Sequence, residues 1–189
     1  MSDRLVGLFA QELGVDAGNL TDASSPENVP QWDSLAAMHG HAREAYPEEC
    51  CGVLFEREGR VQCVRASNVQ NALHIQDPAQ FPRTAASGYT MGPEAAPILI
   101  GSERGELRLL AIYHSHPQRE AYFSQEDRRQ ALGARGEPIY PQAGYIVMSV
   151  RNREVRATKV FVWDAASRDY VEAQIESKSG RGSEQADTP

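Results

Sequence analysis

The sequence predicts a protein of the α/β class, of the α+β type, in which a β-sheet is flanked by helices. Five short runs of apolar and β-branched residues are spaced along the chain, and stretches of helical composition precede the first run and follow the third. The chain has 189 residues, of which 41% are hydrophobic, so it can bury a core and suits one domain with extensions.

The first predicted element of this domain is a helix over residues 34–46. Leu35, Met38 and Ala42 recur at helical spacing and form one apolar stripe. Either Asp33 or Ser34 can be its N-cap, and Pro47 ends it. The stripe gives this helix one face that can be buried.

Strands and loops make up most of the remaining domain. A turn with a glycine at residues 56–60 joins the first two strands into a hairpin, and a turn at 151–154 joins the last two. Residues 68–92 are polar and broken by prolines, which predicts a loop-rich crossover outside the core. The predicted strands are residues 52–55, 61–66, 107–113, 145–150 and 155–162.

The most informative stretch, residues 114–127, follows the third of these strands. Side chains two positions apart on an extended chain share a face, so His114 and His116 can point at one metal ion. Ser124 is an N-cap residue ahead of strong helix formers. Asp127 therefore lies on the first turn of the next helix.

These three candidate ligands, two neutral imidazoles and a carboxylate, leave the fourth tetrahedral position of a zinc ion open to water. That arrangement is typical of catalytic rather than structural zinc. A His-x-His pair often occurs without a metal, and Ser-x-x-Asp alone is more often a simple capping box. Joined in this order, with seven residues between His116 and Ser124, the two patterns indicate a zinc hydrolase far more strongly than either does alone.

The combined pattern, His-x-His, seven residues, then Ser-x-x-Asp, resembles the signature of the JAMM, or MPN+, metallopeptidases of the bacterial type. The resemblance covers residues 34–175 and implies the fold of that family, a cytidine-deaminase-like mixed sheet flanked by helices. In the family pattern a catalytic Glu precedes a Gly by three positions, and Glu49 with Gly52 matches it. Glu48 is out of this register, and two further acids are interpreted as surface residues, Glu120 and Glu126.

The resemblance implies a role for each matched residue. His114, His116 and Asp127 would hold Zn²⁺, which lowers the pKa of a bound water to roughly 7. Glu49 would take the proton of the attacking water and deliver it to the leaving amine. Ser124 would donate a hydrogen bond to the oxyanion, which is worth on the order of 3 kcal/mol in comparable acyl-transfer sites.

The resemblance also implies a substrate class, a peptide or isopeptide bond after a Gly-Gly terminus in a ubiquitin-like or sulfur-carrier protein. An adenylating, E1-like enzyme acting on the same carrier would be a further partner. Residues 68–101 are the expected wall of the groove that holds the substrate tail. A catalytically silent MPN scaffold is the rival within the family, although such scaffolds typically lack the ligands that are in place here.

Residues 1–33 resemble the first half of an acyl carrier protein, with an amphipathic helix, a long loop and an Asp-Ser-Leu at the head of the next helix. In that family the serine carries a phosphopantetheine arm, and Ser34 is the matching position, so a carrier or partner-docking module is an alternative function. Half a bundle cannot bury its own core. We therefore favour a helix and loop that pack on the peptidase domain or on a partner.

The composition bears on partners and location. A formal net charge of −7 disfavours nucleic acid as a partner, because phosphate binding needs a basic surface. No apolar run is long enough to cross a bilayer, a secretory signal is lacking, and three cysteines fit a reducing compartment. We expect a cytoplasmic protein that does not act at a membrane. Residues 176–189, rich in Ser, Gly and charge, are expected to be disordered.

Overall fold

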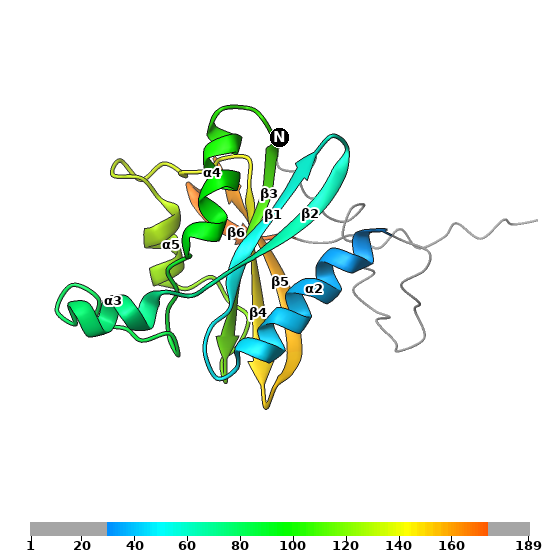
Figure 1. Ribbon diagram of the computed structural model, residues 1–189. Coiled ribbons are helices and arrows are strands. Elements are labelled where there is room, and N and C mark those ends of the chain that lie inside the picture. The colour runs from blue at the N-terminus through cyan, green and yellow to red at the C-terminus, as the bar shows by residue number, and fades with distance from the viewer. Residues whose placement is uncertain (1–29, 174–189) are drawn as a thin grey trace, which may run out of the picture.

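The computed structural model describes residues 30–173, which form a six-stranded mixed sheet with helices on both faces (Figure 1). In chain order the elements are α2 (Pro30–Ala45), β1 (Cys51–Arg57), β2 (Arg60–Ala66), α3 (Gln70–Gln76), the 3-10 turn η2 (Pro93–Ala95), α4 (Ala96–Glu103), β3 (Arg108–Pro117), α5 (Gln125–Ala131), β4 (Gly144–Arg151), β5 (Glu154–Asp164) and β6 (Asp169–Glu172). The strand order is β2-β1-β3-β4-β5-β6, with β3 and β4 parallel and all other neighbours antiparallel. The predicted α+β class and mixed sheet are confirmed.

Two-residue turns close both predicted hairpins. Glu58 and Gly59, with φ of 54° and 74°, join β1 to β2, and Asn152 and Arg153, with φ of 52° and 65°, join β4 to β5. A positive φ at both central residues matches the twist of paired strands. The strands therefore run right up to these turns and are longer than the apolar runs that predict them.

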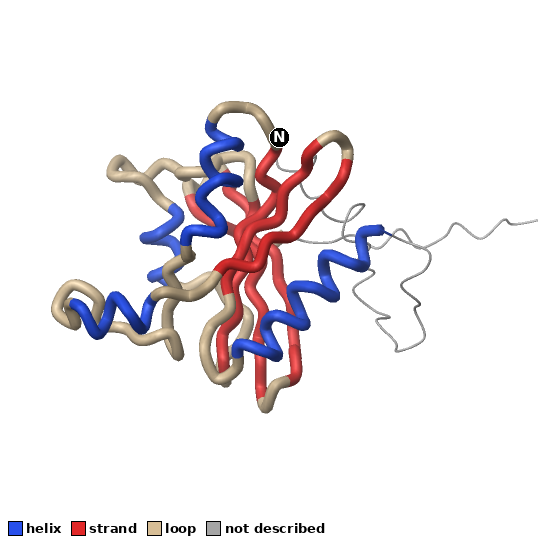
Figure 2. Tube along the Cα trace, in the orientation of Figure 1, coloured by secondary structure: helices blue, strands red, loops and turns tan. Residues whose placement is uncertain are grey.

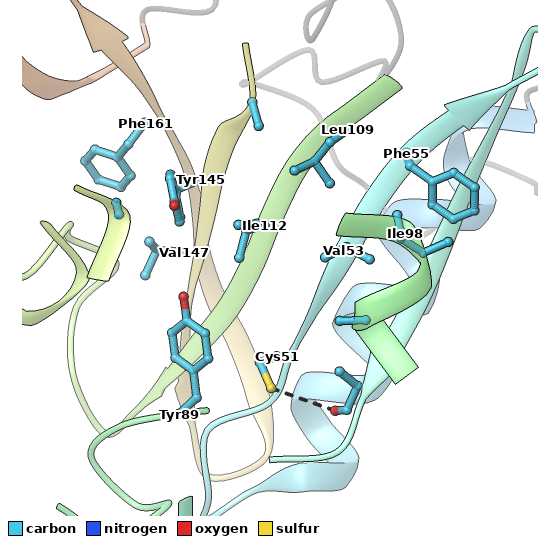
Figure 3. Packing of buried hydrophobic residues seen from close by; sticks show 14 of the residues in the cluster. Cys51, Val53, Phe55, Tyr89, Ile98, Leu109, Ile112, Tyr145, Val147 and Phe161 are labelled. Atoms are coloured by element: carbon cyan, nitrogen blue, oxygen red, sulfur yellow. Dashed lines mark hydrogen bonds between the residues drawn. The ribbon is translucent and has the colours of Figure 1, made fainter. Parts of the chain in front are cut away.

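The two faces of the sheet bury separate hydrophobic clusters. On one face, α2 packs its predicted stripe of Leu35, Met38 and Ala42 against the sheet. On the other, α4 and α5 cover a second cluster, part of which is drawn in Figure 3. Figure 2 shows the strands as a central layer between these helices. Because side chains alternate along β3, Tyr113 belongs to the α2 face and His114 to the opposite one.

The start of α2 differs from the prediction. The helix begins at Pro30, so neither Asp33 nor Ser34 is its N-cap. Proline suits a first helical turn, where its missing N–H would have no partner within the helix. The helix ends at Ala45, just before the proline that was expected to stop it.

The crossover between β2 and β3 contains more structure than the sequence predicts. It forms α3, η2 and α4, and it buries Ala85 and Tyr89. The two helices are only seven and eight residues long, too short for a helical repeat to stand out from the sequence. The four-residue strand β6 is likewise absent from the prediction.

The carrier-like segment up to residue 29 and the tail from residue 174 lie outside the described residues, so the predictions made for them stay predictions. Within residues 30–173, none of the helices is both long and apolar enough to span a membrane.

Candidate metal centre

Two histidines of the central strand β3 meet on the face that α5 covers. His114 and His116 are separated by one residue, so the alternation of the strand turns both side chains to this face. Their Nε2 atoms lie 3.1 Å apart, and the side chains are 0% and 5% exposed. Neighbouring strands hold the backbone on both sides, with Cys51 of β1 opposite His114 and Ser149 of β4 opposite His116.

The capping box at the start of α5 brings a carboxylate to these imidazoles. The Asp127 N–H donates to Ser124 Oγ at 3.1 Å, and the Ser124 N–H donates to Asp127 Oδ2 at 2.7 Å. The carboxylate is thereby fixed with Oδ1 3.3 Å from His114 Nε2 and Oδ2 3.6 Å from His116 Nε2. The Ser-x-x-Asp pattern therefore caps a helix and also places a candidate ligand.

The spacing of the candidate donor atoms is compatible with a tetrahedral zinc ion. Bonds of about 2.0–2.1 Å to nitrogen and oxygen put neighbouring tetrahedral ligands roughly 3.4 Å apart. The two Nε2 atoms lie 3.1 Å apart, and the distances to the carboxylate, which run to different oxygens, are 3.3 Å from His114 Nε2 to Oδ1 and 3.6 Å from His116 Nε2 to Oδ2. Two imidazole nitrogens facing each other at 3.1 Å cannot both present lone pairs unless a cation or a proton lies between them. Among the described residues, this is the one group of three His, Cys, Asp or Glu side chains close enough to share an ion.

Different contacts orient the two rings. His116 Nδ1 lies 3.1 Å from the carbonyl oxygen of Glu120, which can only accept, so Nδ1 carries the hydrogen and Nε2 keeps its lone pair for a metal. His114 Nδ1 is buried and has no hydrogen-bond partner in the described part of the chain. Its ring instead stacks on Tyr89, with centroids 4.7 Å apart and planes inclined by 26°.

The electrostatics of the site keep the carboxylate charged. Burial by itself would raise the pKa of the Asp127 carboxyl, but the charge of His114 and hydrogen bonds from its neighbours hold that pKa well below its usual range. Burial also opposes protonation of His116, yet the neighbouring carboxylates of Asp127 and Glu49 raise the pKa of its ring. A carboxylate ligand has to be ionised to bind a metal, and the lowered pKa favours that form of Asp127.

Two of the three candidate ligands, His116 and Asp127, line a cleft of about 280 Å³. Glu49 and Ser124 line it as well, so the sequence-predicted catalytic pair lies beside these ligands. Glu49 is only 4% exposed. Burial raises the pKa of its carboxyl, and the charges of the two histidines offset part of that rise.

The segment before β1 turns its two adjacent acids in opposite directions. The Glu49 N–H donates to the Ala85 carbonyl at 2.7 Å, and the Glu49 carbonyl accepts from Asn68 Nδ2 at 3.0 Å, so the crossover anchors this residue. Glu48 is exposed and accepts a hydrogen bond from Asn71 at 2.7 Å. Of these two acids, Glu49 alone lines the cleft.

Glu126 corrects one prediction. It is interpreted from the sequence as a surface acid, but its side chain is 14% exposed and forms part of the cleft wall, where it pairs with Arg83 and Arg129. Glu120 is exposed as predicted and pairs with Arg151, although its backbone carbonyl positions His116.

Several further residues of the cleft wall are not singled out by the sequence. Among them, Arg83 and Tyr89 come from the crossover, and Arg119 and Tyr122 come from the loop after β3. The expected groove wall at residues 68–101 includes the first two. The position of the last two between His116 and Ser124 is the only sequence signal for them.

Ser34, the candidate attachment point of a phosphopantetheine arm, is 5% exposed within α2. A carrier serine must be reachable by the modifying enzyme and must present its arm to solvent. The burial of Ser34 therefore disfavours the carrier alternative.

Comparisons with known proteins agree with the fold and the resemblance. Residues 33–172 match the family described as prokaryotic homologs of the JAB domain. Proteins named CysO-cysteine peptidase from Mycobacterium bovis and Mycobacterium tuberculosis are each 30% identical over 131 residues, which covers 68% of this chain and 79% of the relative. The solution structure of a Desulfitobacterium hafniense protein, 22% identical, covers 75% of this chain and 86% of its own with a TM-score of 0.50, which supports the fold alone. The chain belongs to the family of prokaryotic homologs of the JAB domain.

Proposed function

We propose that this protein is a zinc-dependent metallopeptidase that hydrolyses the bond after a Gly-Gly sequence in a ubiquitin-like or sulfur-carrier protein. Family membership and the likeness to proteins named as peptidases support hydrolysis of a peptide bond. The observation that carries the proposal is the group of His114, His116 and Asp127, whose donor atoms lie within 4.8 Å of one another beside the cleft. Bound zinc would supply Lewis acidity, which activates water near neutral pH and polarises a carbonyl.

Glu49 is the proposed proton carrier. Its carboxylate would take a proton from the attacking water and return it to the amine nitrogen as the C–N bond breaks. Burial raises the pKa of this carboxyl, which brings it closer to the working pH and makes both transfers easier. Its neighbour Glu48 lies outside the cleft and cannot replace it.

Ser124 is the proposed oxyanion donor. Its Oγ already accepts the Asp127 N–H, which uses a lone pair and leaves the hydroxyl hydrogen free. Because Ser124 lines the cleft, that hydrogen can be directed at a carbonyl oxygen on which negative charge develops. Helix capping and oxyanion stabilisation are therefore compatible in one side chain.

The substrate class is supported by the relatives and by the size of the cleft. The relatives' name, CysO-cysteine peptidase, favours a sulfur-carrier protein. The cleft of about 280 Å³ has a size compatible with the slim Gly-Gly tail of such a carrier. An adenylating, E1-like enzyme that acts on the same tail would be a further partner.

The test separates metal binding from catalysis. The purified chain should contain about one zinc, by elemental analysis, and His114→Ala should lose it. Glu49→Gln should keep zinc but lose at least 100-fold in hydrolysis of a peptide ending in Gly-Gly-Cys, in line with the loss of a general base. Glu48→Gln is the matched control and should retain both. A chain that never takes up zinc would refute the proposal, and full activity in Glu49→Gln would show that another group moves the proton.

A further inference from the structure

An arginine stands at the rim of the cleft, directly after the metal-binding strand. Arg119 lines the cleft together with Glu49, His116 and Ser124. The chain reverses at Gln118, whose φ is 57°, and this turn carries Arg119 back toward the site.

Hydrogen bonds to β4 fix the backbone around Arg119. The Gln118 N–H donates to a carbonyl of β4 at 2.7 Å, and the hydroxyl of the fully buried Ser149 donates to the Arg119 carbonyl at 2.5 Å. The next carbonyl, of Glu120, accepts from His116 Nδ1. The Cα atom of Arg119 is therefore held at a fixed place relative to a candidate metal ligand.

In the part of the chain that the structure describes, the guanidinium of Arg119 forms no ion pair with a carboxylate, although its charge is near enough to Glu49 to lower the pKa of that carboxyl. Its neighbours differ, since Arg83 lies 3.5 Å from Glu126 and Arg151 pairs with Glu120. Arg119 is thus the cation of the cleft wall that is left available to a ligand.

The other charged residues of the cleft wall indicate what Arg119 could bind. Glu49, Glu126 and Asp127 are carboxylates, which repel an anionic substrate group unless a cation faces it. The guanidinium of Arg119 offers a planar set of donors that binds a carboxylate through two parallel hydrogen bonds. A fixed backbone and a guanidinium without an ion-pair partner suit Arg119 to bind such a carboxylate.

We propose that Arg119 binds the free C-terminal carboxylate of the leaving amino acid, so that the enzyme removes a single residue from the end of a carrier. The inference rests on the proposed function and specifies its substrate. Water adds its oxygen to the carbonyl carbon of the second glycine, the C–N bond breaks, and the amine nitrogen takes the proton. The products are a carrier that ends in a Gly-Gly carboxylate and a free amino acid.

The test compares three peptides with the same N-terminal part, using the zinc-loaded full chain. One ends in Gly-Gly-Cys with a free carboxylate, the second is its C-terminal amide, and the third extends the cysteine by five further residues. Hydrogen bonds to a charged group are worth enough that kcat/KM should be roughly 10- to 100-fold higher for the free acid than for the amide. The extended peptide should be cleaved as poorly as the amide.

Arginine variants identify the residue responsible. Arg119→Ala should bring the ratio of kcat/KM for the free acid to that for the amide close to one, while Arg119→Lys should keep part of the preference. Arg60→Ala, at an exposed arginine that begins β2 and lies outside the cleft wall, is the matched control and should behave like the parent. A merely structural role of Arg119 would lower both rates together and leave their ratio intact.

The outcomes separate this inference from the proposed function. If no peptide is cleaved by zinc-loaded protein, the proposed function fails and the inference fails with it. If the free acid and the amide are cleaved at equal kcat/KM, or if Arg119→Ala keeps the preference, the proposed function stands and the carboxylate site is refuted.

Discussion

A single methyl group at Gly52 is expected to disturb both the sheet and the site. A β-carbon there would lie against the carbonyl oxygen of Val64 on β2 and 2.5 Å from two ring carbons of Tyr113 on β3, well under the 3.0 Å limit of real contacts. Neither neighbour can yield easily. The Val64 oxygen is backbone in the ladder, and Tyr113 is fully buried with its hydroxyl 2.9 Å from His41 Nδ1.

The expected cost of Gly52→Ala follows from these contacts. Restoring ordinary contact with Tyr113 requires a shift of about 1 Å, and overpacking of this kind costs roughly 1–3 kcal/mol. Loss of the Tyr113 hydrogen bond adds about 1 kcal/mol. We expect the free energy of unfolding to fall by about 3 kcal/mol, or Tm to fall by roughly 10 °C in a domain of this size. This opposes the usual effect of Gly→Ala at an unstrained site, which is slightly stabilising.

The assay is urea unfolding followed by circular dichroism, together with hydrolysis of the Gly-Gly-Cys peptide. Gly59→Asn is the control, because Gly59 has φ of 74° and open space around it, and asparagine tolerates that conformation. Its stability should change by less than about 0.5 kcal/mol. Activity of Gly52→Ala should also fall. The neighbouring residue Cys51 lies opposite His114 in the β1–β3 pairing, and Glu49 is three residues before Gly52, so a shift of this strand would displace both site residues. A loss of stability under about 1 kcal/mol would refute the steric reasoning.

Two other predictions concern histidines. Burial, and then the charge of Arg43, lower the pKa of His39 to about 4, and its Nε2 lies 2.9 Å from Thr158 Oγ1. Since the folded pKa lies below the unfolded value of about 6.5, this contribution to stability is complete above pH 6.5 and is lost as the pH falls toward 4, by about 2–3 kcal/mol. His39→Gln should flatten that part of the stability profile, measured by urea midpoints, and an unchanged slope would contradict the assignment. Tyr89→Leu removes the ring stacked on His114 and should weaken zinc binding about 10-fold in chelator competition, by analogy with other supporting contacts of metal ligands; an unchanged affinity would show that β3 alone orients His114.

The candidate ligands are predictable from the sequence because local rules place them. Strand alternation sets His114 and His116 on one face, and the capping box sets Asp127 on the first turn of α5. The apolar runs predict most strands for the same reason, since burial on both faces of a central strand leaves a continuous apolar sequence.

Residues placed by tertiary contacts escape such rules. Tyr89 reaches His114 only because the crossover folds back over the sheet, and Arg119 is held by a hydroxyl from β4 that lies 30 positions away in sequence. Glu126 lies on a short helix, and the residues next to it in sequence do not indicate that it forms an ion pair with the distant Arg83. The predicted N-cap fails similarly, because a proline starts the helix ahead of the residues expected to cap it.

The parallel pairing of β3 with β4 explains why the metal ligands and the proposed specificity residue lie in one short stretch. Parallel neighbours need a crossover, and here it runs from Gln118 to Ala143 and contains α5. The crossover must leave from the carboxyl end of β3, which is where His114 and His116 lie, so the first turn of α5 can return over them with Asp127. The residues between His116 and Ser124 have to make that reversal, and the turn that achieves it places Arg119 on the cleft wall. The seven residues between His116 and Ser124 are therefore the length of chain needed to reverse direction and bring Asp127 to the histidines. Because the same loop carries Arg119 beside the candidate ligands, it can also contribute to the proposed substrate specificity.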